Sequence, residues 1–517
     1  MPKTDIPLSQ DPFSAPYKSI GEELLDNFYL EFASSPTAKT KYYQIGRQGL
    51  RLLQASTQSA ACRGLFTTAS KRTFGVFGQY LYEIQTQGTT KSRVGTLKSY
   101  TGTVRFAENG SQVILVDGQF GYTYDLTGNV FAQITDQYFP GIEDPTQGPT
   151  HVCCIDTYFI VNSSGTNRYY WSSPGYIPYA FDSTHPDILN LWNGLQFGVK
   201  GAASDNILGL IANGTQLYVF GGQDMEVHYN TGRTQGQLFA RIEGAYVMAG
   251  LLAPQSLVRY INDVFWVGQD KDGTIGVFSC GPDYNPKRIS NRGVEARMQM
   301  YQGLSDAFAC PYFMDGHGFV VFTFPSGTST DGSIDTSGAT WAWDCTSSTW
   351  ARRTKWDDAL GTSFRWQAQY VTFNWSNLIW GDQTSDALYQ LDTTYHVDDK
   401  IDGSGIYYIN RIVTTPVGWN NGVNMIYRSI QLNMQQGQGL RTGQGSNPVA
   451  LMSISVDAGF TYGNERAAPI GVTGNYVQRT RWTKCGIGRN RQERFRITEP
   501  IPVIITGITI DGEALSR

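Results

Sequence analysis

One pattern recurs along most of the chain: an alternating apolar strand, a turn rich in Gly, Asn and Asp, and a second strand carrying aromatic residues. Period-2 alternation turns one face of each strand inward, and the turn residues supply the geometry of a β-hairpin. The pattern runs from about Phe66 to about His396. Its instances are TFGVFGQYLYEI (73–84), QVILVDGQFGYTYD (112–125), TYFIVNSSGTNRYYW (157–171), QLYVFGGQDMEVHY (216–229), DVFWVGQDKDGTIGVF (263–278), GFVVFTFPSG…TWAWD (318–344) and NLIWGDQTSDALYQLD (377–392).

Two of these hairpins share a finer signature, YTYD (122–125) and WAWD (341–344). Each places two aromatics on one side of a strand and ends in an Asp that can close an Asx-turn. Hairpins recurring about every 40–60 residues are typical of propeller blades of four strands each. The visible hairpins therefore predict an all-β fold with an irregular β-propeller of six or seven blades. A pair of ordinary β-sandwiches is the alternative.

The pattern changes near the C-terminus, and this change suggests where the chain divides. Residues 398–517 contain longer alternating strands separated by polar turns, which predict a C-terminal β-sandwich. The propeller then occupies residues 51–397, and residues 1–50 form an N-terminal arm. Within the arm, GEELLDNF (21–28) predicts one or two helical turns. The Gly- and Gln-rich stretch at 435–448 predicts an exposed, mobile loop.

Composition excludes several classes of protein. The chain has 517 residues, only 16% of them charged, and a net charge of −4, so it lacks the basic excess of proteins that bind nucleic acid mainly through phosphates. The seven cysteines are odd in number and show no CxxC spacing, which favours reduced core thiols over a disulfide framework. We expect neither a signal peptide nor a membrane helix, because no suitable apolar run is present.

No motif predicts a catalytic, cofactor or metal site. The five histidines are isolated and lack ligand spacing, and GQGLRTG (437–443) lacks the strand and helix that flank a phosphate-binding loop. SVDAGFTY (455–462) matches the S-x-D-x-G-x-T-aromatic box of sialidase-like propellers. In that box the Asp and Thr side chains bond to their own hairpin and the Gly takes a positive φ, so the box is a folding element.

A basic segment, QRTRWTKCGIGRNRQERFR (478–496), is the one strongly charged stretch. It predicts a contact surface for an acidic partner or for the DNA backbone. The alternative is a solvated strand–turn–strand whose arginines alternate on the exposed face. The candidate interface residues are Arg479, Arg481, Lys484, Arg489, Arg491 and Arg494.

Several segments taken in order resemble one family. NFYLE (27–31) leading to Gly49-Leu50, then TFGVFGQYLYEI, then LYVFGGQDMEVHYNTG (217–232), then SVDAGFTYG, and finally RTRWTKCGIGRNRQERFRIT with VIITGITID follow its order through most of the chain. The chain resembles the packaged-DNA stabilisation proteins, the tail hub or nozzle proteins of short-tailed, podovirus-type phages. Gln48 departs from the family pattern, which usually has Pro at this position.

The resemblance implies a structural, non-enzymatic protein of the virion tail, synthesised in the host cytoplasm and needing no cofactor. It implies a six-fold ring, a hexamer, below the portal and its adaptor (head-completion) protein. The ring would retain packaged double-stranded DNA and later form the conduit for its ejection, without specific binding. Tail needle and tailspike or fibre proteins would attach from outside. A propeller glycosidase or depolymerase acting on host surface polysaccharide is the alternative function, and a non-viral propeller scaffold is a further one.

Overall fold

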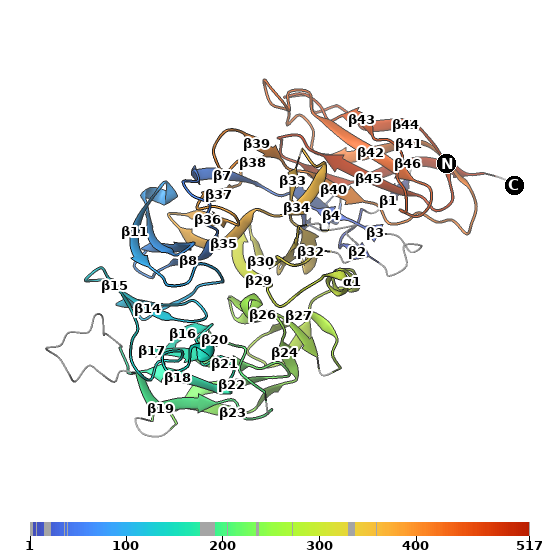
Figure 1. Cartoon of the computed structure of the whole chain (residues 1–517). Helices are drawn as coiled ribbons and strands as arrows, with labels where there is room; N and C mark the ends of the chain where they lie inside the picture. Colours follow the sequence, from blue (N-terminus) through green and yellow to red (C-terminus); the bar gives the residue numbers. More distant parts are fainter. Residues whose placement is uncertain are drawn as a thin grey trace.

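The computed structural model describes residues 4–6, 8–14, 22–35, 37–38, 40–175, 192–203, 205–233, 237–270, 272–328, 335, 337–357 and 359–515. Strands dominate this part of the chain, and they form a propeller joined to a smaller β-sandwich (Figure 1).

Seven sheets in the described part of the chain form the blades of the propeller, in agreement with the predicted fold. Blades 1 to 3 are β8 (Cys62–Thr67), β9 (Thr73–Phe77), β10 (Tyr80–Gln85) and β11 (Thr90–Thr96); β12 (Arg105–Glu108), β13 (Gln112–Val116), β14 (Gly121–Asp125) and β15 (Val130–Gln133); and β16 (Val152–Ile155), β17 (Tyr158–Asn162), β18 (Arg168–Ser172) and β19 (Trp192–Val199).

Blades 4 to 7 continue in chain order, and the last blade is completed by a strand from the N-terminal region. They are β20 (Gly209–Asn213), β21 (Gln216–Phe220), β22 (Met225–Asn230) and β23 (Phe239–Val247); β24 (Ala249–Leu251), β25 (Val258–Tyr260), β26 (Asp263–Asp270), β27 (Ile275–Cys280) and β28 (Pro286–Arg288); β29 (Phe308–Met314), β30 (His317–Phe324), β31 (Ala339–Asp344) and β32 (Thr349–Arg352); and β35 (Ala368–Asn374), β36 (Asn377–Asp382), β37 (Leu388–Asp392) and β7 (Gly49–Gln54).

Every hairpin read from the sequence is the central hairpin of one blade, from β9–β10 to β36–β37. The two signature aspartates act as predicted. The carboxylate of Asp125 accepts from the backbone N–H groups of Thr127 and Gly128 at 2.9 and 3.0 Å. That of Asp344 accepts from Thr346 N–H at 2.8 Å. Each Asx-turn satisfies turn N–H groups that would otherwise need water, which is why Asp ends the third strand of these blades.

The propeller closes where blade 7 meets blade 1. Strand β7 pairs antiparallel with β37, and the innermost strands β35 and β8 lie side by side. Asp386 bonds across this seam to the Lys91 ammonium of blade 1 at 2.6 Å, and its carboxylate also accepts from the backbone N–H groups of Thr57 and Gln58. Burial raises the Asp386 pKa, but these hydrogen bonds outweigh it and hold the pKa at about 2.

The sandwich is built from two sheets that enclose one core, as predicted for the C-terminal region. One sheet has the order β44 (Thr480–Gly488), β41 (Met425–Met434), β46 (Ile504–Ala514), β6 (Tyr42–Gly46) and β5 (Phe28–Phe32), with β1 (Thr4–Ile6) also paired to β46. The other contains β4 (Leu25–Asp26), β40 (Arg411–Thr414), β45 (Gln492–Ile497), β42 (Val449–Ser455) and β43 (Arg466–Pro469).

Residues 25–54, here called the N-terminal segment, connect the two units. Strand β4 pairs in parallel with β32 of blade 6 and antiparallel with β40 of the sandwich. Blade 6 and one sheet of the sandwich therefore form one nine-stranded sheet. Strands β5 and β6 then run in the sandwich, and β7 completes blade 7. The boundaries at 50 and 397 stay a prediction, but the pairing shows that this segment is shared by both units.

The helical turns predicted for residues 21–28 are wrong in the described part, because Leu25–Asp26 and Phe28–Phe32 are strands. Leu25 and Phe28 are fully buried between the sheets, and pairing on both sides of β4 satisfies its backbone without a helix. The sequence did not predict helix α1 (Arg292–Met300), whose N-cap Asn291 accepts from Val294 N–H at 2.8 Å. No helix among the described residues is long and apolar enough to cross a membrane.

Candidate functional site

Side chains from several blades contact one another near the axis of the propeller, where propeller enzymes commonly place their substrate. Arg105 of blade 2 reaches blade 5, where its guanidinium donates to the side-chain and backbone oxygens of Gln255 at 2.9 and 2.7 Å. The Thr103 hydroxyl lies 2.6 Å from that of Tyr370 in blade 7. The Tyr370 ring stacks on Phe308 of blade 6, with centroids 4.9 Å apart.

His151, Cys153 and Cys154 are packed within the propeller. No group of three or more His, Cys, Asp or Glu among the described residues is placed to hold a metal ion. Burial lowers the pKa of His151 to about 3, so its ring is neutral and its Nε2 lies 3.0 Å from the Pro254 carbonyl. Cys153 and Cys154 face the cores of different blades, as expected for adjacent strand residues.

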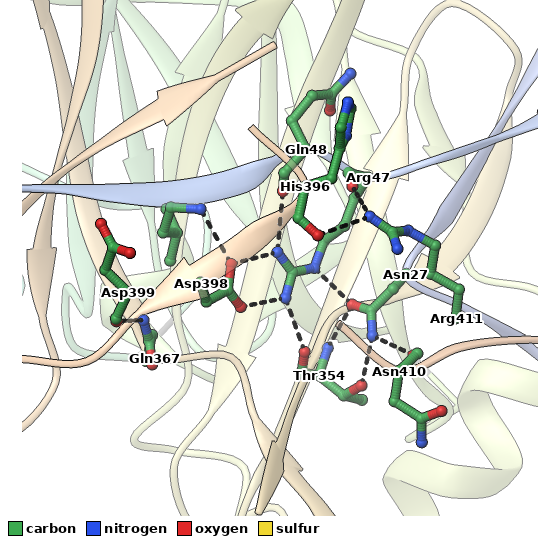
Figure 2. Close-up of polar contacts among 11 residues, drawn as sticks. Asn27, Arg47, Gln48, Thr354, Gln367, His396, Asp398, Asp399, Asn410 and Arg411 are labelled. Atoms are coloured by element: carbon green, nitrogen blue, oxygen red, sulfur yellow. Dashed lines mark hydrogen bonds and ion pairs between the residues drawn. The ribbon is translucent and has the colours of Figure 1, made fainter. Parts of the chain in front are cut away.

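The densest polar cluster lies where propeller, sandwich and N-terminal segment meet (Figure 2). The Arg47 guanidinium, between β6 and β7, donates to both carboxylate oxygens of Asp398 at 2.9 and 2.6 Å. It also donates to the Asn27 side-chain oxygen at 2.7 Å and to the Thr354 carbonyl at 3.1 Å. Both side chains of the Arg47–Asp398 pair are at most 3% exposed. A bidentate buried pair of this kind fixes the orientation of the elements it joins.

A second buried cation, Arg411 at the start of β40, completes this cluster. Its guanidinium donates to the backbone carbonyls of Arg47, His396 and Glu499 at 3.2 to 3.3 Å. Burial and the nearby Arg47 charge lower the Arg411 pKa to about 9, so Arg411 remains protonated at neutral pH. Figure 2 shows Asp398 as the carboxylate facing Arg47, on strand β38 (Val397–Asp399). The cluster is therefore sensitive to loss of that one negative charge.

Backbone packing is equally tight at this junction. A Cβ built on Gly49 would lie 1.9 Å from the Val397 carbonyl oxygen, so only glycine allows β7 and β38 to approach this closely. Gln48 stands where the family that the chain resembles usually has Pro. Its side-chain amide donates to the Asp315 carboxylate at 2.9 Å and to the Tyr29 hydroxyl at 3.2 Å. Residues 48–50 are therefore constrained by close packing against β38 and by the hydrogen bonds of Gln48, neither of which the sequence pattern shows.

His317 forms a further contact between the N-terminal segment and blade 6. Its Nδ1 lies 2.7 Å from the Asp344 carboxylate and its Nε2 lies 2.6 Å from that of Glu31 on β5. Burial alone would lower the His317 pKa, but the hydrogen bonds to Asp344 and Glu31 outweigh burial and raise it. An imidazole between two carboxylates therefore joins the sandwich sheet to the propeller.

The predicted basic patch is split by the structure. Arg479, Arg481 and Lys484 are exposed on or beside β44, the edge strand of a sandwich sheet, and Arg489 is exposed in the turn that follows. Thr480 and Trp482 point inward, as expected for a strand with one solvated face. The alternation is interrupted at Lys484, where the register of the pairing with β41 shifts, and Cys485 is the next residue to point into the core. Whether these four cations contact a partner stays a prediction.

The two remaining candidates are held within the fold. Arg491 is 1% exposed, and its Nε donates to the Glu493 carboxylate while the guanidinium lies 4.0 Å from the Tyr427 ring centroid. It therefore offers no surface to a partner. Arg494 is half-buried, over the ring of Tyr462 at 4.1 Å. Strict alternation would place Arg491 on the same exposed face as Arg489, but the turn at 489–490 breaks the alternation, and Arg491 is buried beside Gly418. A count of charges cannot detect this break.

The Asp-box is a folding element, as predicted. Asp457 accepts from Thr461 N–H at 2.9 Å and from its hydroxyl at 2.6 Å, and the Ser455 hydroxyl accepts from Gly459 N–H at 2.8 Å. Gly459 adopts φ 93°. All the acceptor capacity described for Asp457 is directed at its own hairpin, which lies in the sandwich and far from the propeller axis.

In the described part of the chain, seven blades joined to a β-sandwich by a shared N-terminal segment define a β-propeller protein with a C-terminal sandwich. The comparison with protein families identifies which one. Two family models match, "Bacteriophage P22 Gp10, beta-propeller" over residues 24–396 and "Bacteriophage P22 Gp10, beta-sandwich" over residues 410–513. The chain therefore belongs to the P22 Gp10 family of phage stabilisation proteins, and it is a structural component of a phage virion.

No curated protein matches the chain. Among solved structures, it is similar to the mitotic checkpoint complex, with 11% identity and a TM-score of 0.38 over 70% of this chain and 97% of that one. The computationally designed Ika8 protein has 12% identity and a TM-score of 0.35 over 75% and 98%. The extracellular domain of a hybrid two-component system from B. thetaiotaomicron has 10% identity and a TM-score of 0.39 over 66% and 41%.

Proposed function

We propose that this protein is the tail hub, or nozzle, of a short-tailed phage. Six copies form a ring below the portal and its adaptor protein. The ring retains packaged double-stranded DNA and becomes the conduit for its ejection, while needle and tailspike or fibre proteins attach from outside. The observation that carries this proposal is the two-domain match to the phage stabilisation family over 24–396 and 410–513.

Three structural features support a role in bearing load rather than in chemistry. Side chains of blades 2, 5, 6 and 7 contact one another near the propeller axis, which supports a DNA path along the axis of the ring of subunits rather than through a single chain. The nine-stranded sheet makes blade 6 continuous with the sandwich. The Arg47–Asp398 cluster fixes the angle between the two units. A subunit that resists bending suits a ring that holds DNA under pressure.

The test is a cryo-EM reconstruction of the tail vertex of purified virions. We expect this chain to occupy a symmetric ring around the DNA path, directly below the adaptor. A position as an outer appendage, or absence from the tail, would contradict the proposal. A ring of five or seven copies would support the role as a DNA conduit but would contradict the proposed number of six copies.

A glycosidase or depolymerase is the competing function, and the geometry gives it less support. Retaining and inverting glycosidases need two carboxylates facing each other across a cleft, whereas Asp457 is committed to its own hairpin. We expect the purified chain to release no product from host capsule or lipopolysaccharide. Turnover of either polysaccharide would overturn the assignment as a non-enzymatic protein.

A further inference from the structure

The end of the sandwich remote from the propeller is formed by three loops, residues 416–424, 456–463 and 486–491, here called the distal tip. Strand β40 starts at the junction with Arg411 and runs toward this end, where Gly418 N–H donates to the Arg491 carbonyl at 2.7 Å. Ala458 N–H donates to the Asn490 carbonyl at 2.9 Å. The three loops are therefore bound to one another and present a single preformed surface.

The distal tip exposes large apolar side chains around a free cation. Trp419 is 66% exposed, and Val456, Phe460 and Ile487 are each at least half exposed. Arg489 projects from the same tip, and no ion pair within the described part of the chain engages it. Across the described residues, eight of the twenty exposed large hydrophobic side chains fall in 410–513, a fifth of the chain. Apolar patches of this kind on a folded protein indicate an interaction surface.

A cleft of complementary character lies between blades 2 and 3, here called the acidic cleft. Its volume is about 450 Å³, within the range of sites that hold a large side chain or a small ligand. Tyr138 and Leu195, which are 42% and 83% exposed, form its apolar part. Glu143 and Asp144 contribute the charge, and the described lining contains no Lys or Arg. Hydrogen bonds from Thr146 and Gln147 lower the Asp144 pKa, so this carboxylate stays ionised.

The charge of the two units favours a second copy of this chain as the occupant. Residues 410–513 carry 11 Lys and Arg against 6 Asp and Glu, whereas the rest of the chain carries 29 against 38. Strands β18 and β19 contribute Tyr170 and Leu195 to the lining of the acidic cleft. In Figure 1 these strands lie at the opposite end of the molecule from the part of the sandwich where the chain ends. The distal tip lies at that C-terminal side, because Leu515 N–H donates to the Asn424 carbonyl. One chain cannot bring the two surfaces together, but successive copies can.

We propose that the distal tip of one copy inserts into the acidic cleft of its neighbour. Trp419 and Ile487 pack on Tyr138 and Leu195, and Arg489 pairs with Glu143. Such a head-to-tail contact uses two different surfaces, so it generates a ring when the rotation between copies closes. The inference rests on the proposed ring function and names the residues that close the ring.

Disulfide trapping in assembled tails tests this contact. The variant Leu195→Cys/Ile487→Cys is expected to give a ladder of covalent oligomers up to the full ring on non-reducing electrophoresis. Leu360→Cys/Ile487→Cys is the matched control, because Leu360 is also exposed, at 69%, but lies away from the cleft. Equal trapping in the two variants, or trapping of the tip to a different tail protein, would overturn the inference.

Charge exchange provides a second readout that does not depend on new cysteines. Arg489→Glu places like charges opposite each other and is expected to lower the yield of assembled tails about tenfold, with unchanged folding of the isolated chain. Adding Glu143→Arg to the same chain should restore assembly. If wild-type virions show the ring by cryo-EM but neither rescue nor trapping occurs, this inference fails and the proposed function stands. If no ring is present, both fail.

Discussion

The sandwich and the propeller are stabilised in different ways. The sandwich has one continuous core between its two sheets, to which the N-terminal segment contributes Leu25, Phe28 and Leu30. The propeller instead has a series of smaller cores between adjacent blades, and the last of them, around Ile379, spans the seam between blades 7 and 1. Each blade contacts mainly its neighbours, so the propeller depends on closure, whereas the sandwich depends on its single interior.

The N-terminal segment couples the unfolding of the sandwich to that of the propeller, although their cores are separate. The same 30 residues supply β4 and β5 to the sandwich side and β7 to the closing blade. Opening either unit therefore disturbs the other. We expect the wild-type chain to unfold in one cooperative transition, and the following variants test how strongly the two units are coupled.

The largest effect is expected for Asp398→Ala. Removing this carboxylate leaves the buried cations Arg47 and Arg411 without their nearest negative charge, at a cost of about 3–5 kcal/mol. Urea unfolding monitored by tryptophan fluorescence should show the loss, together with a split into two transitions.

Arg51→Ala is the control for this variant, because Arg51 forms its ion pair with Asp392 while 49% exposed. Its loss should be below about 1 kcal/mol. Similar losses in the two variants would show that the buried cluster does not couple the units.

A matched pair of core substitutions compares the two kinds of interior. Ile430 of the sandwich and Ile379 of the propeller seam are both fully buried, and replacing either by Ala should cost about 2–5 kcal/mol. In hydrogen-exchange measurements, Ile430→Ala should lower protection first in β41 and β46, and Ile379→Ala first in β7 and β8. Uniform loss of protection in both variants would mean that the sandwich core and the propeller cores unfold as one unit.

Acid should weaken the propeller seam at Asp386. The Asp386 pKa lies at about 2, below the ordinary 3.8, so its contribution is fully present above pH 3.8 and is lost as the pH falls toward 2. Asp386→Asn should cost ~2 kcal/mol at neutral pH, the size of a charge-assisted buried hydrogen bond. The difference in the free energy of unfolding between variant and wild type should shrink as the pH falls from 3.8 toward 2. A constant difference would contradict the lowered Asp386 pKa.

A smaller effect than that of Asp386→Asn is expected for His317→Gln. The His317 pKa is raised above its ordinary 6.5, so the stabilisation it provides is complete below pH 6.5 and is lost as the pH rises through the raised value. The variant should be less stable than wild type by ~1 kcal/mol at pH 6. Thermal unfolding across pH 6 to 9 should show the two proteins converging on the alkaline side. A stability difference that grows on the alkaline side would contradict a raised His317 pKa.

Local pattern predicted much of the fold. The seven hairpins, the Asx-turns at Asp125 and Asp344, and the Asp-box at 455–461 depend on residues close in sequence, and all were predicted correctly. The basic segment was found, but Arg491 could not be recognised as buried, because its inward direction depends on pairing with other strands. No local signal marked Arg47 and Asp398 as partners, since 351 positions separate them.

Local residue patterns specify the individual strands and turns of this protein: alternation specifies the strands, and Gly, Asn and Asp specify the turns between them. Tertiary structure decided how those units are joined. Strand β4 has only Leu25 and Asp26, too few to show a period, and it became a strand because β32 and β40 offer hydrogen bonds on both sides. The physical reason is that a backbone can be satisfied by partners from anywhere in the chain, whereas a sequence pattern records only its own neighbours.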